Sequence, residues 1–345
     1  MLEATVNQPI TLFTGQWADL TLDEVAGLAS SWGYDGLEIA CSAEHLDVWR
    51  VAEDPGYLKQ RQEVLKRHSL QTWAISNHLT GQAVCDNPID FRHRGIVRPA
   101  VWGDGDQEGV RQRAAEEMKL TAIAARKLGV DTVVGFTGSS IWQYVAMFPP
   151  VPQSVIDQGY EDFAKRWNPI MDVFDSEGVR FALEVHPSEI AYDYHTTRIA
   201  LDAIDNRKAF GLNWDPSHMI WQDIDPVNFI LDFADRIYHV DCKDTRVFRN
   251  DGRRGRMGSH LNWADPRRGW SFVSTGRGDV DWESSFRALR TIGYNGPISV
   301  EWEDAGMDRL HGAAEAVGFI KSLMWKSPER SFDEAFSVDS AASED

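Results

Sequence analysis

The chain has 345 residues, of which 43% are hydrophobic and 26% charged, an ordinary balance for a folded domain. Its 35 basic and 53 acidic side chains give a formal net charge of −18, which argues against a general nucleic-acid binder because such binding depends on basic groups facing phosphates. No run of about 18 apolar residues predicts a membrane span, and residues 1–10 lack the basic and apolar segments of a secretory signal. Three cysteines without CxxC spacing predict reduced thiols and a cytoplasmic location.

Apolar strand-like runs alternate with amphipathic helix-like segments along the chain. We expect strands at residues 10–13, 36–40, 71–76, 131–136, 180–185, 210–214, 236–241 and 297–301. We expect helices at residues 21–32, 58–68, 109–128, 158–177, 195–206, 226–234, 282–292 and 310–324. Thr21 is a candidate N-cap, and Gly129 and Gly178 are suited to end helices. Insertions cover residues 79–108, 137–155 and 245–280.

Eight strand–helix pairs predict a (β/α)8 TIM barrel, an α/β fold, as a single domain over residues 1–326 with long rim loops. A polar, acidic tail at residues 327–345 follows it. A doubly wound open sheet is the competing fold, but it normally places its ligand at one switch point. The carboxyl ends of barrel strands share one rim, so polar groups at several strand ends favour the barrel.

Four apolar runs in the second half end in acids or histidines. The run 210–214 stops at Asp215-Pro216, and His218 follows in the loop; proline cannot continue a central strand. Glu184 lies near the end of the run 180–185, shortly before Pro187, and the last run ends at Glu301. Four carboxylates crowded without a cation would be unfavourable. We therefore infer that these strand ends converge on one divalent metal.

The candidate ligands are mainly hard oxygen donors. Glu184, Asp215 and Glu301 suit Mn²⁺, Mg²⁺ or Co²⁺, and Zn²⁺ is also compatible. The seventh strand should supply a fourth ligand, and His239 and Asp241 are both candidates because residues two apart on a strand share a face. The alternative for each acid taken alone is a helix N-cap or a surface ion pair.

These stretches carry a family resemblance. ALEVHP around Glu184, NWDPSH around Asp215, HVDCKDTR on the seventh strand and SVEWED around Glu301 resemble the xylose isomerase-like barrel superfamily, over roughly residues 10–325. The resemblance implies one divalent ion, with Mn²⁺ favoured, held by a Glu, an Asp, a His and a second Glu. This chain differs from the family's usual His-x-Lys-Asp signature. Asp241 occupies the position of the histidine, and His239 lies two residues earlier.

The resemblance also implies a mechanism, in which the two glutamates move a proton and the histidine of the Asp-x-x-His pair contacts substrate. We therefore expect Glu184 and Glu301 to exchange a proton next to the carbonyl of a keto-sugar, while His218 and His186 position substrate oxygens. The site would then be that of a sugar isomerase or epimerase.

Further substrate contacts are expected at the same rim. His78, at the end of the third strand, and Lys243, after the seventh, are candidates, each with a structural role as the alternative. The rim loops are rich in aromatic residues that could stack a sugar or a planar aglycone, or merely fill loops, among them Trp142.

Three other functions compete with isomerisation. The chain is similar to the catalytic subunits of bacterial C-glycoside deglycosidases, which implies β-elimination from 3-keto-glycosides and a small β-rich partner subunit; otherwise we expect a homo-oligomer. A DNA-repair endonuclease of the endonuclease IV type would want more histidine ligands and a basic groove, which the net charge disfavours. A barrel without catalysis, serving as a binding subunit, is disfavoured by the intact set of acids.

Overall fold

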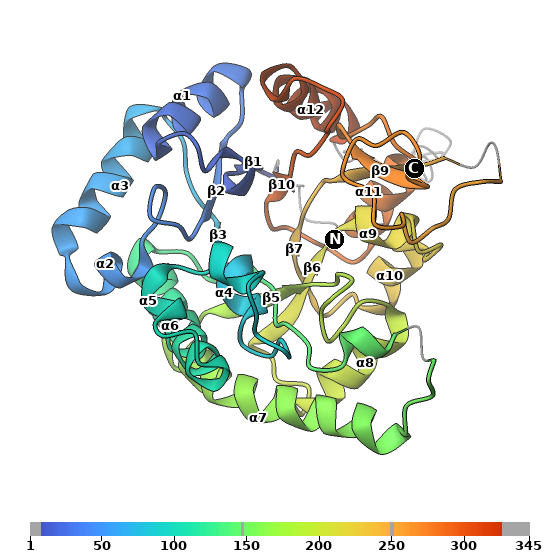
Figure 1. The fold of residues 1–345 in the computed structure, drawn as a ribbon. Coiled ribbons are helices and arrows are strands. Elements are labelled where there is room, and N and C mark those ends of the chain that lie inside the picture. The colour runs from blue at the N-terminus through green and yellow to red at the C-terminus, as the bar shows by residue number, and fades with distance from the viewer. Residues whose placement is uncertain (1–7, 146–147, 249–251, 326–345) are drawn as a thin grey trace, which may run out of the picture.

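The computed structural model describes residues 8–145, 148–248 and 252–325 and shows a barrel of eight parallel strands (Figure 1). The tail predicted at residues 327–345 lies outside this range. The strands run around the barrel in the order β10-β1-β2-β3-β4-β5-β6-β7. They are β1 (Ile10–Phe13), β2 (Gly36–Ala40), β3 (Ala74–Ser76), β4 (Thr132–Gly135), β5 (Arg180–Glu184), β6 (Phe210–Trp214), β7 (Ile237–Val240) and β10 (Ile298–Val300). The predicted fold and its eight strands are confirmed.

The seam between β7 and β10 is the thinnest junction of the barrel. One parallel bridge joins Asp241 to Ser299, and the Cys242 N–H donates to the Ser299 carbonyl at 2.7 Å. The register also shifts between β6 and β7: Leu212 pairs with Ile237, and Asn213 pairs with His239. Tyr238 is the extra residue, so it bulges and both His239 and Asp241 then face inward.

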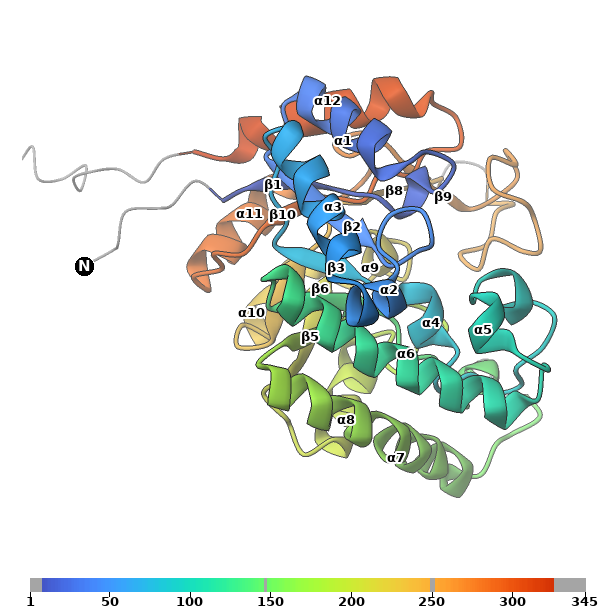
Figure 2. The ribbon, with the colours of Figure 1, turned by 90° about the vertical axis from the view of Figure 1, so that its left-hand side faces the viewer.

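Helices surround the strands (Figure 2). The principal ones are α1 (Leu22–Trp32), α3 (Pro55–Arg67), α6 (Gln107–Leu128), α7 (Gln153–Glu177), α8 (Tyr194–Ala203), α10 (Pro226–Asp232), α11 (Trp282–Thr291) and α12 (Arg309–Leu323). Thr21 forms the predicted N-cap as half of a capping box with Glu24, and Gly129 and Gly178 end α6 and α7 with positive φ. No helix among the described residues is long and apolar enough to cross a membrane.

Several short elements, some inside the insertions and some outside them, were not predicted from the sequence pattern. Short helices and 3-10 turns are η1 (Gly15–Trp17), α2 (Val48–Glu53), α4 (His78–Gln82), η2 (His93–Gly95), α5 (Pro99–Trp102), η3 (Trp142–Tyr144) and α9 (Pro216–Ile220). An antiparallel hairpin, β8 (Asp244–Val247) with β9 (Trp270–Val273), fills part of the segment predicted as a plain loop. These elements were missed because each is too short to show a hydrophobic period, and capping side chains or rim contacts hold them instead.

The barrel interior is layered. At the amino-terminal end, Ala74, Val134 and Ala182 form a small apolar cluster against Tyr238. Above it, toward the carboxyl ends of the strands, the buried side chains are polar: Glu38, Ser76, Asn213, His239, Asp241 and Ser299. Branched apolar side chains usually fill such layers, so the polar layer suggests that something other than packing determines this end of the barrel.

Candidate active site

A cavity of about 380 Å³ opens at the carboxyl end of the barrel. Its acidic and basic lining comes from different elements: Glu184 ends β5, His218 lies on α9, and Glu301 directly follows β10. His78, His186 and Lys243 also line it, together with aromatic side chains from three rim segments, Phe13, Phe136, Trp263 and Phe272. The predicted catalytic residues are therefore brought together around one cavity.

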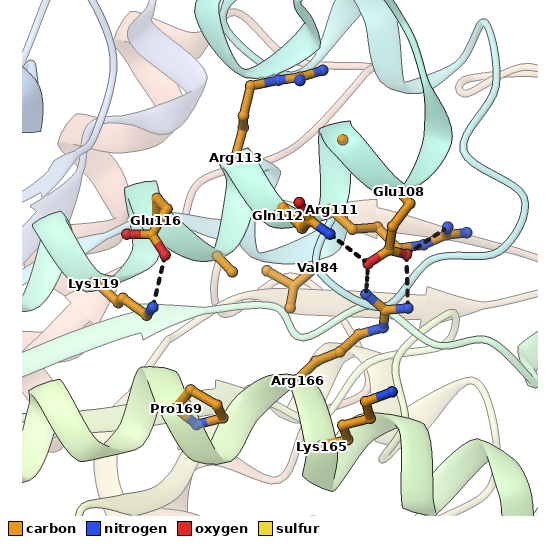
Figure 3. A pocket seen from close by; sticks show the side chains of 12 residues that line it. Val84, Glu108, Arg111, Gln112, Arg113, Glu116, Lys119, Lys165, Arg166 and Pro169 are labelled. Carbon is orange, nitrogen blue, oxygen red and sulfur yellow. Dashed lines mark hydrogen bonds and ion pairs between the residues drawn. The ribbon is translucent and has the colours of Figure 1, made fainter.

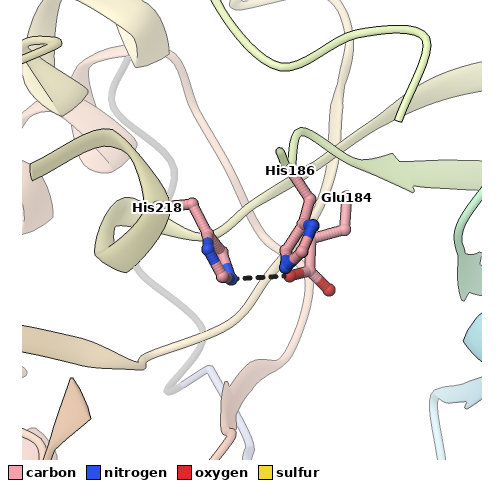
Figure 4. Close-up of side chains that lie close together, drawn as sticks. All are labelled: Glu184, His186 and His218. Atoms are coloured by element: carbon pink, nitrogen blue, oxygen red, sulfur yellow. Dashed lines mark ion pairs between the residues drawn. The ribbon is translucent and has the colours of Figure 1, made fainter. Parts of the chain in front are cut away.

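Glu184 lies between two histidines. Its Oε2 is 3.0 Å from His78 Nε2 and its Oε1 is 3.2 Å from His218 Nε2, and Figure 4 shows His218 facing the carboxylate. Burial would raise the pKa of Glu184, but the contacts with His218 and His78 outweigh it and hold the pKa well below its usual range. Glu184 is therefore an ionised carboxylate at the cavity wall.

Asp215 has two roles at the start of α9. Its Oδ1 accepts the Ser217 N–H at 2.8 Å, so it is also the helix N-cap that was the structural alternative. Its Oδ2 has no hydrogen-bond partner and lies 3.2 Å from His218 Nε2. Burial lowers the pKa of His218, but the charges of Asp215 and Glu184 exceed that effect and raise it to about 9.

His186 lies against His218, with ring centroids 4.0 Å apart in an edge-to-face arrangement (Figure 4). Burial and the neighbouring His218 lower the pKa of His186 well below its usual range, so it is a neutral imidazole. Glu184, His186 and His218 together offer ligand atoms within 4.8 Å of one another. A neutral ring at this position can accept or donate a hydrogen bond to a substrate oxygen.

Glu301, directly after β10, lines the same cavity as Glu184. Its Oε1 accepts from Lys243 Nζ at 2.9 Å and from Gln16 Nε2 at 2.8 Å. Burial raises the pKa of Glu301 to about 8, because the nearby Lys243 only partly offsets burial and the charge of Glu184. Its Oε2 is buried without a partner, and Lys243 Nζ lies 4.4 Å over the centre of the Phe272 ring.

Three carboxylates meet closely enough to bind one ion. Glu184, Asp241 and Glu301 each offer an oxygen within 4.8 Å of the others. Burial, followed by the charges of Glu38 and Glu301, raises the pKa of Asp241 well above its usual range. Because Asp241 Oδ1 and Glu301 Oε2 are buried oxygens without hydrogen-bond partners, the donor set fits a divalent cation. Asp215 lies beside this group, across His218.

The two candidates on the seventh strand have different surroundings. Neither side chain lines the cavity. Asp241 belongs to the group with Glu184 and Glu301, whereas His239 Nε2 is 3.3 Å from Glu38 Oε2. Trp142 also does not line the cavity, because it packs edge-to-face on Tyr192. Its role in substrate binding remains a prediction.

Sequence reasoning missed several residues of the site. Gln16 lies on a 3-10 turn, and Trp263 and Phe272 come from the 245–280 insertion. Glu38 lies in the predicted strand at residues 36–40 but was not among the predicted site residues. A charged residue inside the apolar run GLEIA is the one signal that could have identified it, since an unpaired buried carboxylate is costly.

Known proteins place this geometry in a family. YfiH of Bacillus subtilis (strain 168), an uncharacterized protein, is 25% identical over 334 residues, which are 91% of this chain and 99% of that protein. The structure of the 3-keto-D-glucoside 4-epimerase YcjR from E. coli is similar with a TM-score of 0.64 and 14% identity, covering 91% and 99% of the two chains. The IolI protein with a bound zinc atom gives a TM-score of 0.59 and 18% identity, covering 91% and 96%.

The family described as xylose isomerase-like TIM barrel matches residues 26–323, which include every strand after β1 and all of the candidate ligands. The chain therefore belongs to the xylose isomerase-like TIM barrel family.

Proposed function

We propose that this protein is a divalent-metal-dependent enzyme that removes a proton next to the carbonyl group of a keto-sugar, as in sugar isomerases and epimerases. The carrying observation is the group formed by Glu184, Asp241 and Glu301, whose oxygens lie within 4.8 Å of one another, with Glu184 and Glu301 lining the cavity. A bound Mn²⁺ or similar ion would polarise the sugar carbonyl and stabilise the enediolate.

The side chains around the ion would divide the remaining work. Glu184, kept ionised by His78 and His218, would accept the proton from carbon. Glu301, oriented by Lys243 and Gln16, would return a proton. A pair of carboxyl groups in contrasting surroundings is suited to this exchange.

Histidines would orient the sugar between the two carboxyl groups. His186 and His218 lie on the same wall of the cavity, with ring centroids 4.0 Å apart. Neutral His186 can bond a sugar hydroxyl, while protonated His218 can donate to the carbonyl or to the developing oxyanion. The epimerase activity of YcjR and the zinc atom in IolI support this assignment by family membership.

The second candidate reaction is β-elimination from a 3-keto-glycoside. The same enolate would expel the group at C1, and a specific observation favours a planar aglycone at the mouth of the cavity. Trp263 stacks on Phe272 with ring centroids 5.0 Å apart, yet 52% of its surface is exposed. A partly exposed aromatic side chain that lines the cavity can contact a ring of the ligand. A small β-rich partner subunit belongs to this alternative.

Proton exchange in D₂O tests both candidates. The metal-loaded protein is incubated with ketoses and with 3-keto-glycosides, and the products are followed by NMR. Deuterium in a product with an intact carbon skeleton would establish isomerase or epimerase chemistry, whereas release of a free aglycone would establish elimination. Glu301→Gln should abolish either signal with an unchanged circular dichroism spectrum. Absence of deuterium and of aglycone across both substrate classes would overturn the proposal.

A further inference from the structure

The polar layer inside the barrel contains a second group of possible ligands below the first. Glu38 on β2, His239 on β7 and Asp241 beyond β7 offer ligand atoms within 4.8 Å of one another. Their relative exposures are 1%, 0% and 0%. Glu38 and His239 lie on strands, and Asp241 pairs with Ser299 through one parallel bridge, so backbone pairing fixes their positions.

Asn213 determines the tautomer of His239. The Asn213 amide donates from Nδ2 to Asp241 Oδ2 at 2.6 Å, which turns its Oδ1 toward His239 Nδ1 at 2.9 Å. An amide oxygen accepts, so Nδ1 of His239 carries the hydrogen. Nε2 is left with a lone pair, and burial lowers the pKa of this histidine. Fixing one ring nitrogen in this way typically prepares the other as a metal ligand.

The atoms that face one another in this layer lack partners. Glu38 Oε1 accepts from the Ser76 hydroxyl, but Glu38 Oε2 and His239 Nε2 have no hydrogen-bond partner although they are only 3.3 Å apart. Asp241 Oδ1 is also without one. Two lone pairs and a third acceptor oxygen directed at one buried space are unfavourable unless a positive group lies between them.

The formal charge of the barrel interior points in the same direction. Five buried carboxyl groups, Glu38, Glu184, Asp215, Asp241 and Glu301, face two buried cationic groups, the Lys243 ammonium and the His218 imidazolium. A single divalent ion among Glu184, Asp241 and Glu301 leaves an excess of negative charge. Glu38 is the carboxylate that such an ion would not contact, since it belongs only to the group with His239.

We propose that Glu38, His239 and Asp241 form a second divalent-cation site inside the barrel, with Asp241 shared between the two ions. Asp241 Oδ2 accepts from Asn213, whereas Asp241 Oδ1 has no hydrogen-bond partner and is available to a cation. One imidazole nitrogen and two carboxylates suit Mn²⁺, Co²⁺ or Zn²⁺. The inference shares Asp241 with the proposed reaction but does not require that reaction.

Metal stoichiometry and Mn²⁺ EPR test the second site without an activity assay. The full-length protein is stripped with EDTA, dialysed against Mn²⁺, and its bound metal is measured by mass spectrometry. We expect two ions per wild-type chain and a spin-coupled EPR spectrum. Glu38→Gln keeps the Ser76 contact but should bind one ion and show an uncoupled six-line spectrum. His239→Gln should weaken the second ion at least about 10-fold.

Glu117→Gln is the matched control. Glu117 is another buried glutamate, but it accepts from Trp49 and Thr80 outside the barrel interior, so this variant should keep two ions. One ion in the wild type, or two in a folded Glu38→Gln variant, would overturn the second site. If that one ion is lost in Glu184→Gln, the first site and the proposed function stand; no ion in the wild type would contradict both.

Discussion

Two hollows of this molecule are lined by charged side chains, and they differ in whether those charges are satisfied. A groove of about 600 Å³ lies between α6 and α7 on the outside of the barrel (Figure 3). There Arg166 pairs with both oxygens of Glu108 and also with Asp162, and Arg113 donates to the carbonyls of Val101 and Trp102. These charged groups already have hydrogen-bond or ion-pair partners, so we interpret the groove as a structural contact between the two helices.

The inner cavity is smaller, at about 380 Å³, but its polar atoms are incompletely paired. Glu301, which lines the cavity, has an Oε2 without a hydrogen bond. In the buried layer beside it, Asp215 Oδ2 and Asp241 Oδ1 also lack hydrogen bonds. The comparison teaches that volume and charge do not identify the site in this protein. Unsatisfied buried oxygens do, because their desolvation is compensated only when a ligand binds.

The largest expected effect is on catalysis, and it should differ between the inner cavity and the outer groove. Glu184→Gln should lower kcat by at least about 10³-fold and weaken Mn²⁺ binding, since it removes both a proposed base and a ligand. Glu108→Gln is the matched change in the outer groove, where the partly exposed ion pairs are worth about 1 kcal/mol or less. It should leave kcat within about two-fold. Steady-state kinetics and metal titration measure the effect of each substitution. Equal losses of kcat in the two variants would show that the inner cavity does not differ from the outer groove in this respect.

An intermediate effect concerns a carboxyl group that is buried yet well bonded. Glu189 Oε2 accepts from the backbone N–H groups of Thr137 and Gly138 at 2.7 and 2.6 Å. Burial and the charge of Asp86 raise the pKa of Glu189 to about 8. An acid whose pKa is raised on folding stabilises the protein at low pH, and this contribution is lost as pH rises from its unfolded pKa toward about 8.

Glu189→Gln should remove that pH dependence. Relative to wild type, the variant should gain about 4 kcal/mol of unfolding free energy between about pH 5 and about pH 9. Urea unfolding in EDTA at both pH values measures the change, and Glu161→Gln, at an exposed position of α7, serves as control. A constant difference between Glu189→Gln and wild type at both pH values would show that Glu189 does not titrate in this range.

The smallest effect sharpens the view of the cavity mouth. Trp263→Ala should raise KM for an aromatic 3-keto-glycoside about 5- to 10-fold and leave kcat within about two-fold, because stacking contributes roughly 1 kcal/mol. Values for a ketose without an aglycone should not change. Leu310→Ala, at a similarly exposed apolar position outside the cavity, is the control. If the variant lowered kcat and left KM unchanged, Trp263 would contribute to the reaction and not to binding of the aglycone.

The parts of this site that the sequence predicts are those with a local signal. Glu184, Asp215 and Glu301 follow apolar runs, and two of these runs are broken by proline, so strand ends and acids could be recognised together. The eightfold alternation predicted the barrel for the same reason.

What escaped prediction depends on the register between strands. The bulge at Tyr238 determines whether His239 or Asp241 lies in the ligand group with Glu184. No residue in that segment predicts a bulge. The Glu38 carboxylate lies next to His239 only because strands that are far apart in the sequence come together in the barrel. Gln16 and Trp263 lie on irregular segments, whose positions follow from tertiary contacts and not from periodicity.

The single-bridge seam between β7 and β10 has a mechanical consequence. Asp241 and Glu301 belong to the two strands that border it, and both direct an oxygen into the same space. An ion coordinated by both would cross-link the barrel where its backbone is joined most sparsely. Metal loading would then close the wall of the barrel as well as activate the substrate, and the protein stripped of its ion would be weakest along this one line.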